Sequence, residues 1–214
     1  MNITDKLEKV FTNIYSENLW SMGQNDSKCG IGSSHNFTQH ITNHLPNIIN
    51  KYNIKNMIDT SCGDLYWMKR VFPKLNCTYL GIDIVKQHID ANISQFNSQH
   101  TQFHHGDFVE YLKTLPNKSV DLILCRHTCE HLPDEHIMQF LNEAQRTTKY
   151  LLVTTHKNAT HNTNVITTDT PYRPINLNIT PYSEYIGHYQ IDSLYDGPEY
   201  EFRSEMYINL YHFQ

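Results

Sequence analysis

The chain has 214 residues, 39% of them hydrophobic, and carries 17 Lys and Arg against 22 Asp and Glu, for a net charge of −5. This length predicts one domain with a sizeable core. The acidic balance argues against a main role in binding nucleic acid, because duplex binding needs a concentrated basic face. No run approaches the ~18 consecutive apolar residues of a membrane span, and the N-terminus resembles no targeting segment. We therefore expect a soluble, cytoplasmic protein without nucleic-acid or membrane partners.

Helical and strand-like patterns alternate along most of the chain. In chain order the sequence predicts a helix over Lys6–Leu19, a helix over Asn36–Tyr52, a strand over Met57–Ser61, a helix over Leu65–Phe72, a strand over Thr78–Ile84, a helix over Lys86–Gln95, a strand over Thr101–His105, a helix over Phe108–Leu115, a strand over Val120–Arg126, a helix over Asp134–Thr147 and a strand over Tyr150–Thr155. Short apolar strands separated by helices are typical of a parallel sheet. The helices are too few for a closed barrel, so we predict a doubly wound, Rossmann-like α/β fold.

Two segments interrupt this alternation. Ser21–Ser34 is polar and bears glycines, which favours a lid or binding loop. Lys157–Tyr195 is rich in Pro and Tyr, and the alternating aromatics of Tyr200–Phe213 predict one or two strands that close the sheet with an antiparallel C-terminal edge. We expect a single domain, with an N-terminal helix and lid over residues 1–35, a core over 36–214 and a substrate-binding insertion around 157–195.

The cysteines favour a reducing compartment. Their number is odd, and they lie in or beside apolar runs: Cys29, Cys62, Cys77, Cys125 and Cys129. Such positions suit buried, reduced thiols rather than a disulfide framework. Cys125 and Cys129 alternate with His127 and His131, but structural zinc sites pair closely spaced cysteines with a second distant pair, which this chain lacks. We therefore expect no metal.

The turn after the first predicted strand combines small residues with two acids. The strand and turn read Met57-Ile58-Asp59-Thr60-Ser61-Cys62-Gly63-Asp64, and small residues at such a turn let a ligand approach the backbone. A dinucleotide fold needs three glycines here and only Gly63 is present, so NAD and FAD are disfavoured. The carboxylates of Asp59 and Asp64 suit a cofactor that bears positive charge.

Acids also follow the next two predicted strands. Asp83 follows Gly63 by about 20 residues, where open sheets bind a ribose diol. After the third strand, Asp107 can accept from an exocyclic amine or cap the following helix, and Phe108 can cover a ring. Open α/β sheets bind ligands at the carboxyl ends of their strands, so these groups predict a ligand that contains a nucleoside.

Together these motifs resemble the class I S-adenosylmethionine-dependent methyltransferases over roughly residues 36–156. The resemblance rests on Asp59…Cys62-Gly63-Asp64, Gly81-Ile82-Asp83, Gly106-Asp107 and Asp121…Cys125…Glu130-His131-Leu132. A narrower resemblance, to a little-characterised and mostly bacterial subgroup, covers nearly the whole chain and rests on Trp20, Gly30–Ser34, Cys62-Gly63-Asp64-x-x-Trp67-Met68 and Tyr172–Leu177.

This resemblance implies S-adenosylmethionine as the cofactor. It implies that Asp59 and Gly63 lie near the methionine part, with Asp64 a candidate partner of the ammonium group. It further implies Asp83 on the ribose hydroxyls. The remaining residues that we expect to contact the cofactor are Trp20, Gly32, Ser33, Ser61, Ile84, Asp107, Phe108 and Arg126. The chain departs from the family pattern in lacking a second glycine after Gly63.

The segment after the fourth predicted strand offers residues for the acceptor side. Methyl transfer from a sulfonium is a direct displacement, but a hydroxyl acceptor also has a proton to lose, and histidine is poised to take it near neutral pH. His127 and His131 are the candidate catalytic residues, and they share one helix face if the chain coils there. The subgroup tends to carry Asp at position 127. The candidate substrate-binding residues are Arg126, His156, Tyr172 and Arg173.

A sugar or glycan hydroxyl is the expected acceptor, because it calls for a base, polar anchors and aromatic surfaces. The alternatives are a methyltransferase for another small molecule or RNA, and a non-catalytic partner subunit that binds the cofactor. An N-methyltransferase with the Asn/Asp-Pro-Pro-Tyr motif is disfavoured, since Cys125-Arg126-His127-Thr128 stands in its place.

Overall fold

The computed structural model describes residues 2–21, 27–164, 172–196 and 206–214. The chain divides into two compact units, residues 1–108 and 109–214. In the described ranges, no helix is both long enough and apolar enough to cross a membrane.

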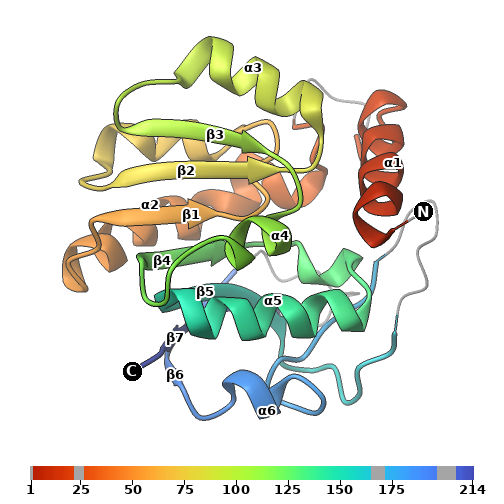
Figure 1. Cartoon of the computed structure of the whole chain (residues 1–214), viewed down its shortest axis with the longest axis vertical. Coiled ribbons are helices and arrows are strands. Elements are labelled where there is room, and N and C mark those ends of the chain that lie inside the picture. Colours follow the sequence, from red (N-terminus) through yellow and green to blue (C-terminus); the bar gives the residue numbers. More distant parts are fainter. Residues whose placement is uncertain (1, 22–26, 165–171, 197–205) are drawn as a thin grey trace. The chain divides into compact units, whose positions relative to one another are not determined.

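The first unit holds a parallel three-stranded layer with helices (Figure 1). Its elements are α1 (Ile3–Ser16), η1 (Ile31–Ser33), α2 (His35–Lys51), β1 (Asn56–Asp59), η2 (Met68–Arg70), η3 (Phe72–Lys74), β2 (Thr78–Asp83), α3 (Lys86–Phe96) and β3 (Thr101–His105). The strand order is β3-β2-β1, with Met57 opposite Tyr79 and Tyr79 opposite Thr101. Parallel pairing brings the carboxyl ends of all three strands to one edge.

Local sequence accounts for the helices of this unit. The side chain of Asn2 caps α1 by accepting from the backbone N–H of Asp5 at 2.8 Å, so the helix begins before the predicted Lys6. Asn18 has a positive φ of 53°, which ends α1 before the predicted Leu19. In α2, Phe37, Ile41, Leu45 and other apolar residues at helical spacing are buried, which places one face in the core.

The helix predicted over Leu65–Phe72 is wrong. That region instead forms the two short 3₁₀ helices η2 and η3. Leu65 has a positive φ of 54°, which an α-helix does not tolerate. Pro73 also disfavours the helical conformation of the residue before it. The apolar pattern correctly indicated buried side chains, since Leu65 and Met68 are fully buried. The backbone, however, forms 3₁₀ turns instead of an α-helix.

The second unit holds a mixed sheet. Helix α4 (Phe108–Lys113) begins at the boundary and is shorter than predicted, and the other elements are β4 (Val120–Cys125), η4 (Cys129–His131), α5 (Asp134–Thr147), β5 (Thr148–His156), α6 (Ser183–Ile186), β6 (Gln190–Tyr195) and β7 (Met206–His212). The strand order is β4-β5-β7-β6, where β4 and β5 are parallel and β7 runs antiparallel to both neighbours. The predicted antiparallel C-terminal strands are therefore present.

Burial explains which strands of this unit the sequence pattern predicted and which it did not. Every residue of β4 is buried, as expected for a central parallel strand. The predicted irregular insertion contains α6 and β6, which the sequence did not reveal because β6 is half-exposed and lacks an apolar run. Residues 165–171 of the insertion, 200–205 of the predicted final strands and 22–26 of the predicted lid lie outside the described residues.

Candidate active site

Asp83 joins two of the predicted cofactor motifs in the first unit. It ends β2 and is only 6% exposed. One carboxylate oxygen accepts from the backbone N–H of Gly63 at 2.8 Å, and the other accepts from that of Val85 at 2.8 Å. Burial raises the pKa of Asp83, although the nearby His88 and the two N–H groups oppose this shift. Each oxygen keeps a lone pair for a further donor, such as a ribose hydroxyl.

Gly63 leaves room at the turn that no other residue would leave. Its φ is +55°, and a Cβ at this position would collide with the Cys29 Sγ atom. The glycine is thus required both by the backbone conformation and by close packing. Position 63 has no side chain, and the Cys29 sulfur packs close to this part of the turn.

Asp64 holds a segment of the N-terminal region on this turn. Its carboxylate accepts from the Ser27 hydroxyl at 3.0 Å, from the backbone N–H of Lys28 at 2.9 Å and from that of Tyr66 at 3.1 Å. In return, the backbone N–H of Asp64 points to the Cys29 sulfur at 3.4 Å. We call Ser27–Cys29 the docking segment. The side chain of Asp64 therefore faces the docking segment, and its predicted role at the cofactor ammonium stays a prediction.

The other predicted cofactor residues, except Arg126, lie on the same unit. Asp59 ends β1, is 4% exposed and accepts from the Tyr79 hydroxyl at 2.9 Å. Asp107 is 5% exposed and accepts from the Thr4 hydroxyl in α1 at 2.8 Å, while Phe108 is buried. The remaining ones lie near the docking segment or at strand ends: Trp20, whose ring packs edge-on against Phe11 and Tyr15; Gly32 and Ser33 in η1; Ser61 in the turn after β1; and Ile84 after β2.

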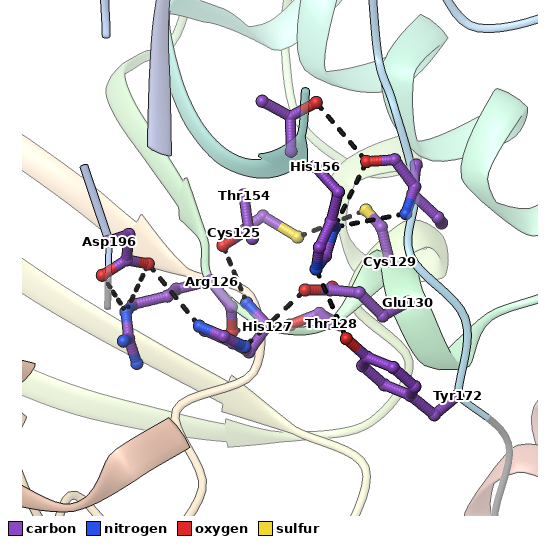
Figure 2. Close-up of polar contacts among 12 residues, drawn as sticks. Cys125, Arg126, His127, Thr128, Cys129, Glu130, Thr154, His156, Tyr172 and Asp196 are labelled. Atoms are coloured by element: carbon purple, nitrogen blue, oxygen red, sulfur yellow. Dashed lines mark hydrogen bonds and ion pairs between the residues drawn. The ribbon is translucent and has the colours of Figure 1, made fainter. Parts of the chain in front are cut away.

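A second polar group follows β4 in the second unit (Figure 2). Arg126 Nε donates to both carboxylate oxygens of Asp196, at 3.1 and 2.9 Å. The His127 ring lies between two carboxylates, with Nδ1 3.6 Å from Glu130 and Nε2 3.6 Å from Asp196. Both acids are at most 1% exposed. We call Arg126, His127, Glu130 and Asp196 the charged cluster.

Asp196 is ionised within the charged cluster. Burial alone would raise the pKa of its carboxyl, but the positive charge and hydrogen bonds of Arg126, together with the nearby His127 ring, outweigh burial and hold the pKa below its usual value. Glu130 differs, because neither of its carboxylate oxygens has a hydrogen bond in the part of the chain that the structure describes. The Nδ1 atom of His127 lies 3.6 Å from one of these oxygens.

The backbone keeps His127 and His131 apart. His127 has a positive φ of 53°, and Thr128 has φ −121°, so no helix connects the two histidines. His131 ends η4, and its ring packs against that of Tyr172 with centroids 5.6 Å apart. The condition under which both histidines share one helix face is therefore not met.

Three predicted substrate residues are built into the protein. Arg126 pairs with Asp196 as described. His156 is fully buried, and its Nδ1 accepts from the backbone N–H of Ile175 at 3.2 Å while its Nε2 lies 3.4 Å from the Tyr172 hydroxyl (Figure 2). Arg173 contacts Asp134, the Tyr182 hydroxyl and a backbone carbonyl. Tyr172, by contrast, is 47% exposed. Their roles toward a substrate stay predictions.

The sequence did not predict the roles of Asp196 and Glu130 or the contacts of the docking segment. Asp196 follows β6, far along the chain from His127, and no motif marks it. Glu130 lies within a recognised motif, but only its burial next to a histidine gives it a role. The hydrogen bonds of Asp64 depend on a loop whose path the sequence does not specify.

Residues 57–150 match the model of a family described as "Methyltransferase domain". The match makes this region, which is less than half of the chain, similar to a methyltransferase domain. A search of curated protein sequences finds no match.

Several solved structures share the fold. They include the 1,6-didemethyltoxoflavin N1-methyltransferase of Burkholderia thailandensis, at 10% identity over 98% of this chain and 88% of that one, with a TM-score of 0.69. They also include the N-methyltransferase NodS of Bradyrhizobium japonicum WM9 with S-adenosylhomocysteine, at 14% identity over 94% and 98%, TM-score 0.64. A third is a SAM-dependent methyltransferase of Archaeoglobus fulgidus, at 18% identity over 82% and 96%, TM-score 0.55.

These likenesses confirm the predicted fold, a Rossmann-like, mainly parallel α/β fold with antiparallel C-terminal strands, in a single domain. Two of the similar structures hold S-adenosylhomocysteine in this fold, which agrees with the predicted cofactor. The narrower subgroup resemblance stays a prediction.

Proposed function

We propose that the protein transfers a methyl group from S-adenosylmethionine to a hydroxyl of a small acceptor, with a sugar or glycan as the preferred class. One observation carries the proposal: the segment directly after β4 holds two histidines, one inside the charged cluster and one beside the exposed ring of Tyr172. A histidine supplies the base that a hydroxyl acceptor calls for, and an exposed aromatic ring offers a platform for a sugar face.

On the cofactor side, the residues present fit the cofactor. Asp83 is a buried carboxylate whose oxygens retain accepting capacity, and it lies directly beside the Gly63 turn. In the proposed arrangement Asp83 accepts from the ribose hydroxyls, while Asp59 and Gly63 lie near the methionine part. The bound cofactor supplies an electrophilic methyl group on a sulfonium. The protein orients the acceptor in line with the S–CH₃ bond, excludes water and receives the acceptor's proton.

An amine acceptor is the second candidate. Two of the structurally similar proteins are N-methyltransferases by name. The Glu130 carboxylate also has no hydrogen-bond donor among the described residues, and an ammonium or amine group is such a donor. An ammonium group loses its proton more readily than a hydroxyl, and the neutral amine attacks through its lone pair, so this reaction depends less on a histidine base.

Product analysis tests the proposal. The protein is incubated with S-adenosylmethionine and separate acceptors: methyl glucoside, methyl rhamnoside, UDP-glucose, glucosamine and a capped RNA. Mass spectrometry then finds a gain of one methyl group, and fragmentation assigns it to oxygen or nitrogen. Methylation of the neutral sugars supports the main proposal, and N-methylated glucosamine alone supports the second candidate. Cofactor binding without turnover on any acceptor favours the non-catalytic partner subunit and contradicts both.

A further inference from the structure

The segment Arg126–His131 places its two histidines in unlike surroundings. The side chain of His127 is 19% exposed, and its Nε2 is buried without a hydrogen bond among the described residues. Both ring nitrogens face carboxylates at 3.6 Å, which is ion-pair rather than hydrogen-bond distance. His131 is partly buried, as His127 is, but its ring lies against the exposed Tyr172.

The backbone fixes His127 in a sparsely populated conformation. Its φ of 53° is uncommon for a residue with a Cβ, and such conformations persist where the surroundings determine them. The backbone N–H of His127 donates to the Thr154 hydroxyl in β5 at 3.1 Å (Figure 2). The ring is therefore held from two sides, by β5 through the backbone and by two acids through the side chain.

The balance of charges in the cluster gives a reason for the His127 ring to lie between Glu130 and Asp196. Arg126 offsets the charge of Asp196, which leaves the buried Glu130 carboxylate in need of a positive charge. The His127 ring lies 3.6 Å from both acids, so a positive charge on this ring would make the charged cluster neutral.

Glu130 also contacts the segment whose aromatic ring packs on His131. The backbone carbonyl of Glu130 accepts from the backbone N–H of Arg173 at 3.0 Å. Arg173 follows Tyr172, whose ring packs on His131. The pairing of His127 with Glu130 thus ties the end of β4 to the segment that carries the exposed aromatic ring.

We infer that His127 is a positioning residue that acts as a buried cation for Glu130 and Asp196, and that His131 is the base that touches the acceptor. This inference rests on the proposed function and decides between its two histidines. In the step, the acceptor oxygen forms a bond to the methyl carbon as the bond from that carbon to sulfur breaks. The sulfur keeps the electron pair and becomes a neutral thioether, and the hydroxyl proton moves to a ring nitrogen of His131.

Two substitutions of His127 distinguish a role as a cation from a role as a base. His127→Lys keeps a positive charge but offers no base near neutral pH, and Lys118 shows that this chain accommodates lysine at a φ of 52°. His127→Gln removes the charge. We expect His127→Gln to lower the thermal unfolding midpoint by roughly 5–15 °C, because it leaves a buried carboxylate unpaired. We expect His127→Lys to change the midpoint by less than about 3 °C.

The stability measurements need no acceptor. A His127→Gln variant as stable as the wild type overturns the inference. If both variants lose stability, the double variant His127→Gln with Glu130→Gln decides: recovery of most of the loss supports the charge pairing, and no recovery overturns it. Asp121→Asn, which removes an acid paired with Lys149 at 2.6 Å, is the matched control for loss of a carboxylate.

Turnover is measured on the best acceptor of the panel above. His131→Gln should lower kcat by roughly 10²–10⁴-fold. His127→Lys should keep kcat within about tenfold of the wild type. A stable His127→Lys variant without turnover, alongside an active His131→Gln variant, makes His127 the base and overturns the assignment. If the wild type methylates no acceptor, the proposed function fails, and the stability measurements still decide whether His127 is a buried cation.

Discussion

The buried acids of the two units are satisfied in opposite ways. In the first unit, the buried Asp59 and Asp83 and the partly buried Asp64 each accept hydrogen bonds from neutral donors nearby, either backbone N–H groups or hydroxyls. In the second, Asp196 pairs with the Arg126 guanidinium, and Glu130 faces the His127 ring, to which we assign a positive charge. Neutral donors hold a carboxylate in place without cancelling its charge, whereas cations cancel it.

This difference matches what each region has to do. A carboxylate that keeps its charge can still attract the hydroxyls or the ammonium of a cofactor. A neutral cluster positions a segment of chain without repelling or attracting the acceptor strongly. We therefore interpret the acids of the first unit as ligands and those of the charged cluster as scaffolding.

The largest expected effect follows from removing charge in the cluster. Asp196→Asn leaves Arg126 buried beside a neutral partner, and breaking a buried ion pair from one side costs about 3–5 kcal/mol. Urea unfolding measures the loss. Should the variant prove as stable as Asp121→Asn, charge pairing would not be what holds the cluster together.

The next effect is a loosened docking segment. Asp64→Ala removes the acceptor for Ser27 and Lys28, with an expected cost of about 1–2 kcal/mol. Hydrogen exchange in residues 27–34 should become faster in this variant. In the wild type it should slow on adding S-adenosylmethionine if the segment belongs to a lid. Protection confined to Gly63 and Asp83 would contradict the lid.

A smaller effect, but the clearest contrast, is the pH dependence of stability. Asp83 has a raised pKa in the folded protein, so its contribution is present below the unfolded value of about 3.9 and is lost as pH rises through the folded pKa. Asp196 has a lowered pKa, so its contribution is present above the unfolded value and is lost as pH falls through the folded pKa.

Two asparagine variants therefore shift in opposite directions between pH 3 and 7. Relative to the wild type, Asp83→Asn should become more stable as the pH rises, and Asp196→Asn should become less stable. Urea unfolding at a series of pH values gives both slopes. Slopes of the same sign would remove the distinction between the two kinds of acid.

The sequence predicted most of the scaffold because local patterns determine it. The fully buried β4 and the amphipathic α5 (Asp134–Thr147) lie where the apolar pattern indicated. The pattern failed where backbone conformation overrode it, at the positive φ of Leu65, and where a half-exposed strand, β6, lacked an apolar run.

The site was predictable to the extent that it follows from spacing along neighbouring strands. Gly63 and Asp83 meet because a parallel pair of strands brings their carboxyl ends together. The charged cluster depends on Asp196, which reaches His127 only through the antiparallel path of the last strands. No local signal connects residues so far apart in sequence.

Calorimetric titration with S-adenosylhomocysteine tests the central claim, that the first unit binds the cofactor through Asp83. The wild type and Asp121→Asn should bind equally well. Asp83→Ala should bind weaker by about 1.5–3 kcal/mol, or roughly 10- to 150-fold, because two hydroxyls lose their acceptor. A folded Asp83→Ala protein with unchanged affinity would contradict the account.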